Sequence, residues 1–121
     1  MLIIEGQTVA TPNAVMTALA APSRGSAEIS TWRVRMEQGA SGPLHTIDRE
    51  QVWMPLSGVL RAEVAEEVAP VVPEQALVVP AGVPRRFHAP DGPVEILVCM
   101  PNGGRASTPG SPEPIEIPWA K

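Results

Sequence analysis

His45 and Arg85 are the two side chains whose types and settings best suit chemistry. His45 follows the Gly-rich turn from Gly39 to Pro43, and Arg85 follows the turn Pro80-Ala81-Gly82. A histidine can act as a general acid or base near neutral pH. An arginine can hold a carboxylate, enolate or phosphate through paired charge-assisted hydrogen bonds. The pair therefore predicts the binding of a small organic acid, or proton transfer on one.

Both residues also have ordinary structural roles. His45 could be a core histidine that hydrogen-bonds to Gln51, but we favour a role in a pocket because Gln51, Trp53 and Arg85 are expected to face the same space. Arg85 could instead form an ion pair, or bend to the rim and stay hydrated. If it is buried, it needs an anionic partner, and the inward positions offer no obvious acid.

The segments that would position these residues have the pattern of short strands. In residues 30–37 apolar and charged side chains alternate, which is typical of a strand with one wet face. Further strands are expected at 51–56, 59–64, 76–79, around 87–88 and at 94–100. This spacing, in a chain with 15 prolines and 10 glycines, predicts an all-β barrel or sandwich. Strand parity turns four large side chains inward: Trp32, Met36, Trp53 and Phe87.

The two ends of the sequence have weaker patterns. Thr11-Pro12-Asn13 predicts a short helix through Leu19. Residues 101–114 predict an irregular or mobile loop, and the alternation of Ile115, Ile117 and Trp119 favours docking of the last segment on the barrel. We therefore divide the chain into an extension that packs on the barrel (1–29), the barrel (30–100) and a Pro/Gly-rich tail (101–121).

Composition excludes several functions. The chain has a net charge of −4 and eight arginines and one lysine without a long basic cluster, so we expect no nucleic-acid partner. The single cysteine, Cys99, excludes an internal disulfide and a cysteine zinc cluster, and we interpret it as a buried, inert thiol. No apolar run approaches the length of a membrane span, and no signal peptide is recognisable, so the expected location is the cytoplasm.

Two spaced motifs in the chain resemble those of the cupin superfamily. The residues that match them are Gly39, His45, Gly58, Pro80 and Gly82. At the remaining metal-ligand positions the chain has Ile47 for a histidine, Gln51 for a glutamate and Arg85 for a histidine. The resemblance covers residues 30–100 and implies a single-domain cupin β-barrel, that is, a jelly-roll-like double-stranded β-helix.

The resemblance also implies a metal site that is largely missing. In cupins that hold a metal ion, three histidines and one glutamate converge inside the barrel. Isoleucine has no donor atom, an amide oxygen is a weak ligand, and a guanidinium is a cation without an acceptor. His45 and Gln51 are the only weak candidates left, so we expect no metal cofactor. Glu50 and His88 should lie on the opposite strand faces, with His88 exposed or at the rim.

The sequence thus predicts a small cupin-fold protein that binds a small, anionic organic ligand or a polyketide-like aromatic molecule in an apolar pocket. His45 would be the catalytic base, and Gln51 and Arg85 would orient the ligand. The other residues expected to contact it are Ile47, Trp53, Phe87, Met36 and Trp32. The reaction, if there is one, would be an isomerisation, cyclisation or lyase step driven by proton transfer.

Two alternatives remain open at this point. The first is a non-catalytic module that binds or senses a ligand in the same pocket, which leaves open whether the protein is an enzyme. The second is a metal-dependent cupin dioxygenase with unusual ligands. Because cupin chains commonly pair through their sheets, the resemblance also implies a homodimer.

Overall fold

The computed structural model describes residues 1–121 and is built almost entirely of short β-strands. The one helical element is a 3₁₀ turn, η1 (Pro22–Arg24). The strands are β1 (Gln7–Ala10), β2 (Val15–Ala18), β3 (Ile29–Met36), β4 (Thr46–Ile47), β5 (Gln51–Ser57), β6 (Leu60–Val64), β7 (Glu67–Val71), β8 (Leu77–Val79), β9 (Arg85–His88), β10 (Val94–Pro101), β11 (Arg105–Thr108) and β12 (Ser111–Glu116). The all-β prediction is confirmed, but the strands expected from the sequence did not include β1, β2, β4, β7, β11 and β12.

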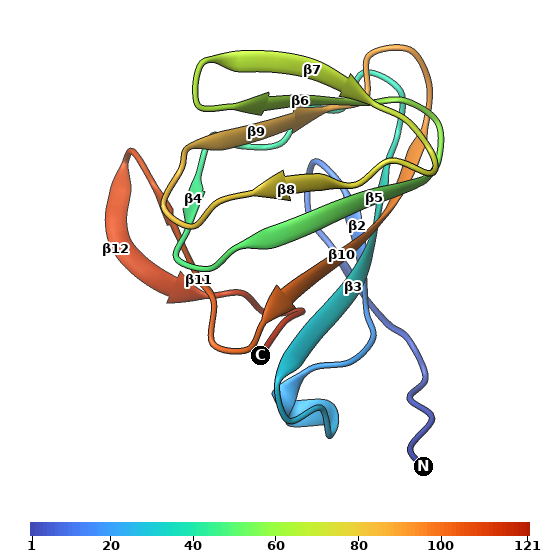
Figure 1. Cartoon of the computed structure of the whole chain (residues 1–121), viewed down its shortest axis with the longest axis vertical. Coiled ribbons are helices and arrows are strands. Elements are labelled where there is room, and N and C mark those ends of the chain that lie inside the picture. The colour runs from blue at the N-terminus through green and yellow to red at the C-terminus, as the bar shows by residue number, and fades with distance from the viewer.

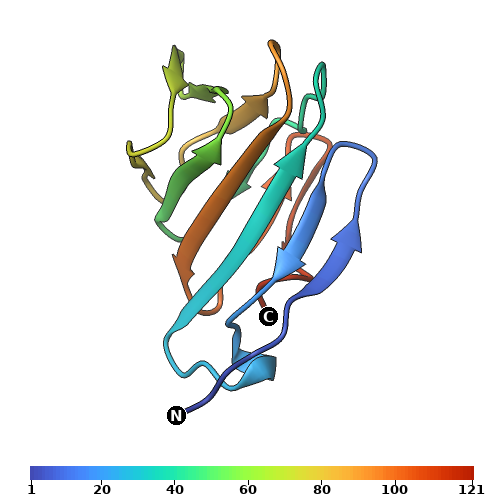
Figure 2. The ribbon, with the colours of Figure 1, turned by 90° about the vertical axis from the view of Figure 1, so that its right-hand side faces the viewer.

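The strands form three antiparallel sheets around one core (Figure 1). The largest has the order β1-β2-β3-β10-β5-β8, and the two smaller sheets have the orders β12-β11-β4 and β7-β6-β9. Figure 2 shows the long strands β3 and β10 side by side in the large sheet, with β1 and β2 along its outer edge. The barrel is therefore an open cup whose two smaller sheets lie opposite the large one, which is the jelly-roll arrangement expected of a cupin.

The pairing of β3 with β10 forms the centre of the large sheet. Val94, Ile96 and Val98 alternate with more exposed residues and lie opposite Met36, Val34 and Trp32. Successive side chains of a strand point to opposite faces, so this register directs both apolar sets into the cup. The core cluster contains Trp32, Val34, Met36, Ile47, Trp53, Leu60, Ala62, Val71, Val79, Phe87, Ala89, Val94, Ile96, Val98, Met100, Ile117 and Ala120.

The helix predicted from Thr11 to Leu19 is wrong. Residues 11–14 form the turn of a hairpin instead, in which the Thr11 Oγ1 accepts a hydrogen bond from the Ala14 amide at 3.1 Å. A Thr side chain that binds the backbone ahead of it can close a turn as well as cap a helix. The following strand, β2, pairs with β3, so the extension adds two strands to the large sheet.

The irregular loop predicted for residues 101–114 is also wrong. β11 and β12 form a hairpin around Pro109 and Gly110, and β11 also pairs with β4. Prolines are tolerated in β12 because it is an edge strand, in which only the amides that face β11 are needed for the ladder. Ile115, within β12, is largely exposed. Ile117 and Ala120, which follow β12, are buried, so the last segment does dock on the cup.

No helix of the structure has the length and apolar character needed to cross a membrane.

Candidate functional site

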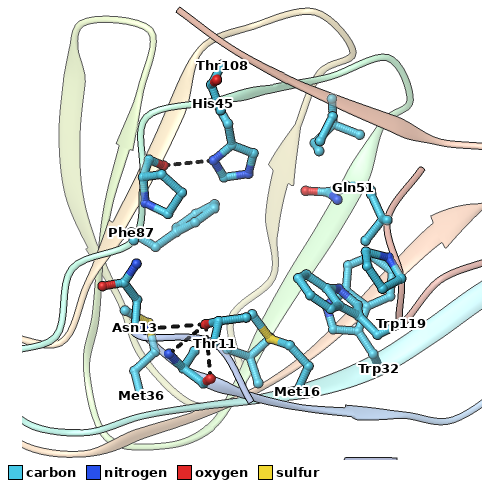
Figure 3. A pocket seen from close by; sticks show the side chains of 18 of the residues that line it. Thr11, Asn13, Met16, Trp32, Met36, His45, Gln51, Phe87, Thr108 and Trp119 are labelled. Atoms are coloured by element: carbon cyan, nitrogen blue, oxygen red, sulfur yellow. Dashed lines mark hydrogen bonds between the residues drawn. The ribbon is translucent and has the colours of Figure 1, made fainter. Parts of the chain in front are cut away.

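The cup encloses a cavity of about 380 Å³. Its volume lies in the range of pockets that hold small organic molecules. The wall is mostly apolar and combines strands from the middle of the chain with segments from both ends of the sequence (Figure 3). Among titratable residues, only His45 and Glu116 line it.

His45 projects into the upper part of the cavity in Figure 3, between Phe87 and Gln51. Its backbone is held by two hydrogen bonds with Arg85, of 3.0 Å and 2.9 Å. The Nδ1 atom lies 2.8 Å from the Pro43 carbonyl oxygen. Because a carbonyl can only accept, Nδ1 carries the hydrogen and donates it. The Nε2 atom therefore has the free lone pair, and no group of the protein bonds to it.

The surroundings of His45 keep its ring neutral. Burial is the largest cause and lowers the pKa of His45. The hydrogen bond to Pro43 acts in the opposite direction, and the nearby positive charge of Arg85 adds to the lowering. At neutral pH the ring is thus an uncharged base whose lone pair faces an apolar space.

Gln51 is fixed by a hydrogen-bond network rather than by His45. Its Oε1 accepts bonds from Trp53 Nε1 at 3.0 Å and from Arg85 Nη1 at 3.2 Å. Since this oxygen faces two donors, the orientation of the amide is settled, and Nε2 lies 3.6 Å from the Met100 sulfur. The second N–H of Gln51 has no acceptor within the protein. The alternative that His45 is a core residue bonded to Gln51 does not match this geometry.

Arg85 is completely buried but does not line the cavity. Its Nε and Nη2 atoms donate to the Val83 carbonyl at 3.1 Å and 2.9 Å, and Nη2 also donates to the Pro80 carbonyl at 2.9 Å. Burial lowers the pKa of Arg85 to about 10, so the side chain stays charged at neutral pH. The sequence predicted direct contact between Arg85 and a ligand. The structure instead directs the guanidinium to backbone carbonyls and to Gln51.

The four residues that strand parity turned inward, Trp32, Met36, Trp53 and Phe87, all line the cavity. The six predicted residues of the wall are Trp32, Met36, Ile47, Gln51, Trp53 and Phe87, and each of them lines the cavity. The rings of Trp53 and Phe87 are stacked, with centroids 3.8 Å apart and an angle of 22° between their planes. This stack gives one side of the cavity a flat aromatic surface.

Sequence reasoning missed the part of the wall that comes from the two ends of the sequence. The missed residues include Thr11, Asn13, Met16, Thr108 and Trp119. Figure 3 shows Trp119 and Trp32 on the same side of the cavity, and Thr11, Asn13 and Met16 at its lower end. The alternation that ends in Trp119 indicated docking, but no local pattern indicated that the docked segment would meet a cavity.

Two other reactive residues lie outside the cavity. His88 is on the opposite face of β9 from Arg85 and Phe87, as expected, with Nδ1 2.6 Å from Ser41 Oγ and Nε2 3.3 Å from a Glu63 carboxylate oxygen. Cys99 is half-buried rather than buried, because it alternates with the inward residues of β10. Burial raises the pKa of the Cys99 thiol, which disfavours the reactive thiolate.

The residues at the four positions of the cupin metal motif do not fit a metal ion. His45 Nε2 is the only free donor atom among them. Gln51 Oε1 already accepts two hydrogen bonds, Ile47 has no donor atom, and the cationic guanidinium of Arg85 lies directly beside Gln51. No group of three or more His, Cys, Asp or Glu side chains could hold a metal anywhere in the chain. One nitrogen ligand is too few for a stable site.

The family model described as "Cupin domain" matches residues 32–100. No protein with a curated description matches the sequence. Among solved structures, the polyketide cyclase RemF from Streptomyces resistomycificus is 21% identical, with a TM-score of 0.69 over 81% of this chain and 73% of that chain. A cupin 2 domain-containing protein from Halorhodospira halophila is 18% identical, with a TM-score of 0.75 over 80% of this chain and 70% of that one.

A further similar structure is oxalate decarboxylase from Bacillus subtilis. It is 16% identical, with a TM-score of 0.73 over 82% of this chain. The match covers only 28% of the oxalate decarboxylase chain, so the present chain corresponds to about a quarter of that enzyme. At these identities the likeness shows the fold and leaves the chemistry to the residues of the cavity.

The lowered pKa of His45 has a measurable consequence. In an NMR titration, the His45 ring should protonate below the ordinary histidine pKa of about 6.5, with hydrogen on Nδ1 in the neutral form. The unfolded chain then binds its proton at higher pH than the folded chain. The free energy of unfolding should therefore fall as the pH drops through the ordinary value toward the lower folded one. His45→Gln assigns the signal and removes this part of the pH dependence, and a pKa above 6.5 would contradict the neutral base.

Arg85 should be required for stability. Arg85→Ala leaves the carbonyls of Pro80 and Val83 and the Gln51 oxygen without their donors, so we expect a loss of about 3 kcal/mol or more in the free energy of unfolding. The matched control is Arg86→Ala on the exposed face of the same strand, with an expected loss of about 1 kcal/mol or less. Urea unfolding measures both variants. Equal losses would show that the buried network contributes little.

Proposed function

Since the chain belongs to the cupin domain family, we propose that it binds a small, largely apolar organic molecule in its cavity and that His45 acts on that molecule as a base. The observation that carries the proposal is the free Nε2 of a neutral His45, which faces an otherwise apolar space of about 380 Å³. An acceptor without a partner at the wall of an apolar cavity favours a ligand that brings a donor to it.

The shape of the wall favours a flat ligand. Trp32, Trp53, Phe87 and Trp119 all line the cavity, and two of these rings are stacked on each other. Aromatic rings bind flat, weakly polar molecules well because they offer a large rigid surface. An aromatic or polyketide-like molecule fits this wall better than a sugar or another densely hydroxylated compound.

The polar groups favour a hydroxyl or an acidic C–H beside a carbonyl. His45 Nε2 would accept the proton from the ligand, and the free N–H of Gln51 would donate to the carbonyl oxygen. This pair suits an isomerisation, a cyclisation or a lyase reaction, in which a proton is removed next to a carbonyl group. The fold shared with a polyketide cyclase and with the structures described as DMSP lyases is compatible with such chemistry.

Binding should depend on His45 and on the ligand's hydroxyl group. Naphthalene and 2-naphthol differ only in that group, and quenching of the tryptophans in the wall can report both. We expect 2-naphthol to bind about fivefold more tightly than naphthalene, because a net hydrogen bond is worth about 1 kcal/mol. His45→Ala should remove the difference, whereas His88→Ala, outside the cavity, should keep it. Equal affinities for the two compounds, or no quenching, would contradict the proposal.

A second arm of the experiment separates an enzyme from a binding module. The ketone 2-tetralone has acidic C–H groups next to its carbonyl, and their exchange with D₂O is followed by NMR. A general base typically contributes a factor of about 100 or more, so His45→Ala should lose at least that much of the accelerated exchange. Binding of 2-naphthol without any acceleration would favour the non-catalytic ligand-binding or sensing module over the enzyme.

The proposal includes a homodimer, which the family resemblance implies. β1 is an edge strand of the large sheet and is largely exposed, so its backbone is available for pairing with a second copy. Light scattering should give twice the 12.8 kDa mass of the chain. A single mass equal to one chain at high concentration would contradict the dimer.

A further inference from the structure

Arg85 is a buried positive charge that has no negative partner. Its side chain is completely buried, and none of the ion pairs in the protein involves it. The groups that hold it are the carbonyls of Pro80 and Val83 and the amide oxygen of Gln51. Carbonyl dipoles satisfy the hydrogen bonds of a guanidinium, but they are neutral groups and leave its net charge in place.

Gln51 connects Arg85 with the cavity, because it accepts a hydrogen bond from the guanidinium and also lines the cavity. Its oxygen faces Arg85 and its nitrogen faces away, so the amide dipole is aligned with the field of the guanidinium. Gln51 lines the cavity, and its second N–H has no acceptor in the protein. An amide dipole held in this orientation presents its N–H groups to neighbouring atoms. The amide does not have to reorient when a ligand binds.

Few other charges act on the same space. His45 is the nearest titratable group in the wall, and it is neutral at neutral pH. Glu116 is exposed at the rim, where its carboxylate lies 3.6 Å from the ammonium group of Lys121. Solvent and this ion pair screen Glu116, whereas Arg85 is buried and screened much less. Arg85, which is one hydrogen bond away from the wall residue Gln51, is therefore the least screened charge near the inner part of the cavity.

We propose that the cavity selects the deprotonated form of an acidic phenol or enol, whose anionic oxygen accepts the free N–H of Gln51 and is stabilised by the buried charge of Arg85. The inference rests on the proposed function, since it names the class of ligand for the same cavity. Arg85 acts here as a positioning residue that never touches the ligand. The proton lost from the hydroxyl group goes to water at equilibrium, or to His45 Nε2 within the complex.

The direction in which the acidity of a phenol changes on binding distinguishes this inference from simple burial. An apolar cavity without a net charge disfavours an anion and therefore weakens the acidity of a bound phenol. A cavity with an uncompensated positive charge strengthens it. The ionisation of a bound phenol thus reports which of the two dominates.

The test uses p-nitrophenol, whose phenolate absorbs visible light. Its absorbance is followed against pH, free and with saturating wild-type protein. We expect the acid dissociation constant of the bound molecule to be about tenfold larger than that of the free molecule, the scale of a nearby unlike charge. A bound molecule that is less acidic than the free one would overturn the inference.

Gln51→Glu is the informative variant, because it has the same shape and places a carboxylate against Arg85 Nη1. The resulting ion pair cancels the charge and the carboxylate also lacks the N–H proposed to bind the anion, so both proposed contributions are lost. No hydrogen bond of Arg85 is removed, so the fold should be kept, and thermal unfolding checks this. We expect the bound p-nitrophenol to become less acidic than the free molecule. The control is Arg61→Gln, which changes the net charge equally at an exposed position of β6 and should behave as wild type.

The possible failures are distinguishable. If neither p-nitrophenol nor 2-naphthol binds, the proposed function fails and this inference fails with it. If both bind but p-nitrophenol becomes less acidic in the wild-type protein, only the present inference fails. An equal shift in wild type and in a folded Gln51→Glu variant would show that Arg85 is not its source. The wild-type result needs no variant, so the inference stays testable even if Gln51→Glu does not fold.

Discussion

The buried guanidinium of Arg85 constrains much of the surrounding structure. It binds the Pro80 and Val83 carbonyls, which fixes the turn between β8 and β9, and it binds Gln51 at the start of β5. Its backbone pairs with that of His45 in the opposite loop. A charge in an apolar interior is tolerated only when nearly all of its hydrogens are directed to acceptors. The position of the turn, the orientation of the Gln51 amide and the placement of His45 are therefore coupled.

The fold could be predicted because its central elements have strong local patterns. The alternation around Trp32 and Val34 and the apolar run from Val94 to Met100 each indicate a strand with one buried face. The turn that contains Pro80 and Gly82 adds a spacing that few other folds share. Parity then placed Trp53 and Phe87 inside, because alternation along a strand leaves only two directions for a side chain.

The rest of the site depends on contacts between residues far apart in the sequence. Strand parity predicted that Arg85 points inward. It could not predict that the guanidinium would bind the carbonyls of Pro80 and Val83 and so be unavailable to a ligand. The hairpin of β11 and β12 was missed for a related reason. Its Pro-rich strand has little intrinsic preference for a sheet and is stabilised by pairing with β11, which in turn pairs with β4.

The cavity is closed by parts of the chain that are made at very different times during synthesis. The turn at Thr11 and the side chain of Trp119 line the same space. The Ser30 hydroxyl donates to the Ala120 carbonyl at 2.6 Å, which ties the late segment to β3. Segments at the edges of a fold are among the first to open by local unfolding. A molecule held between them would favour the closed form, so that occupancy of the cavity and the docking of both segments would rise and fall together.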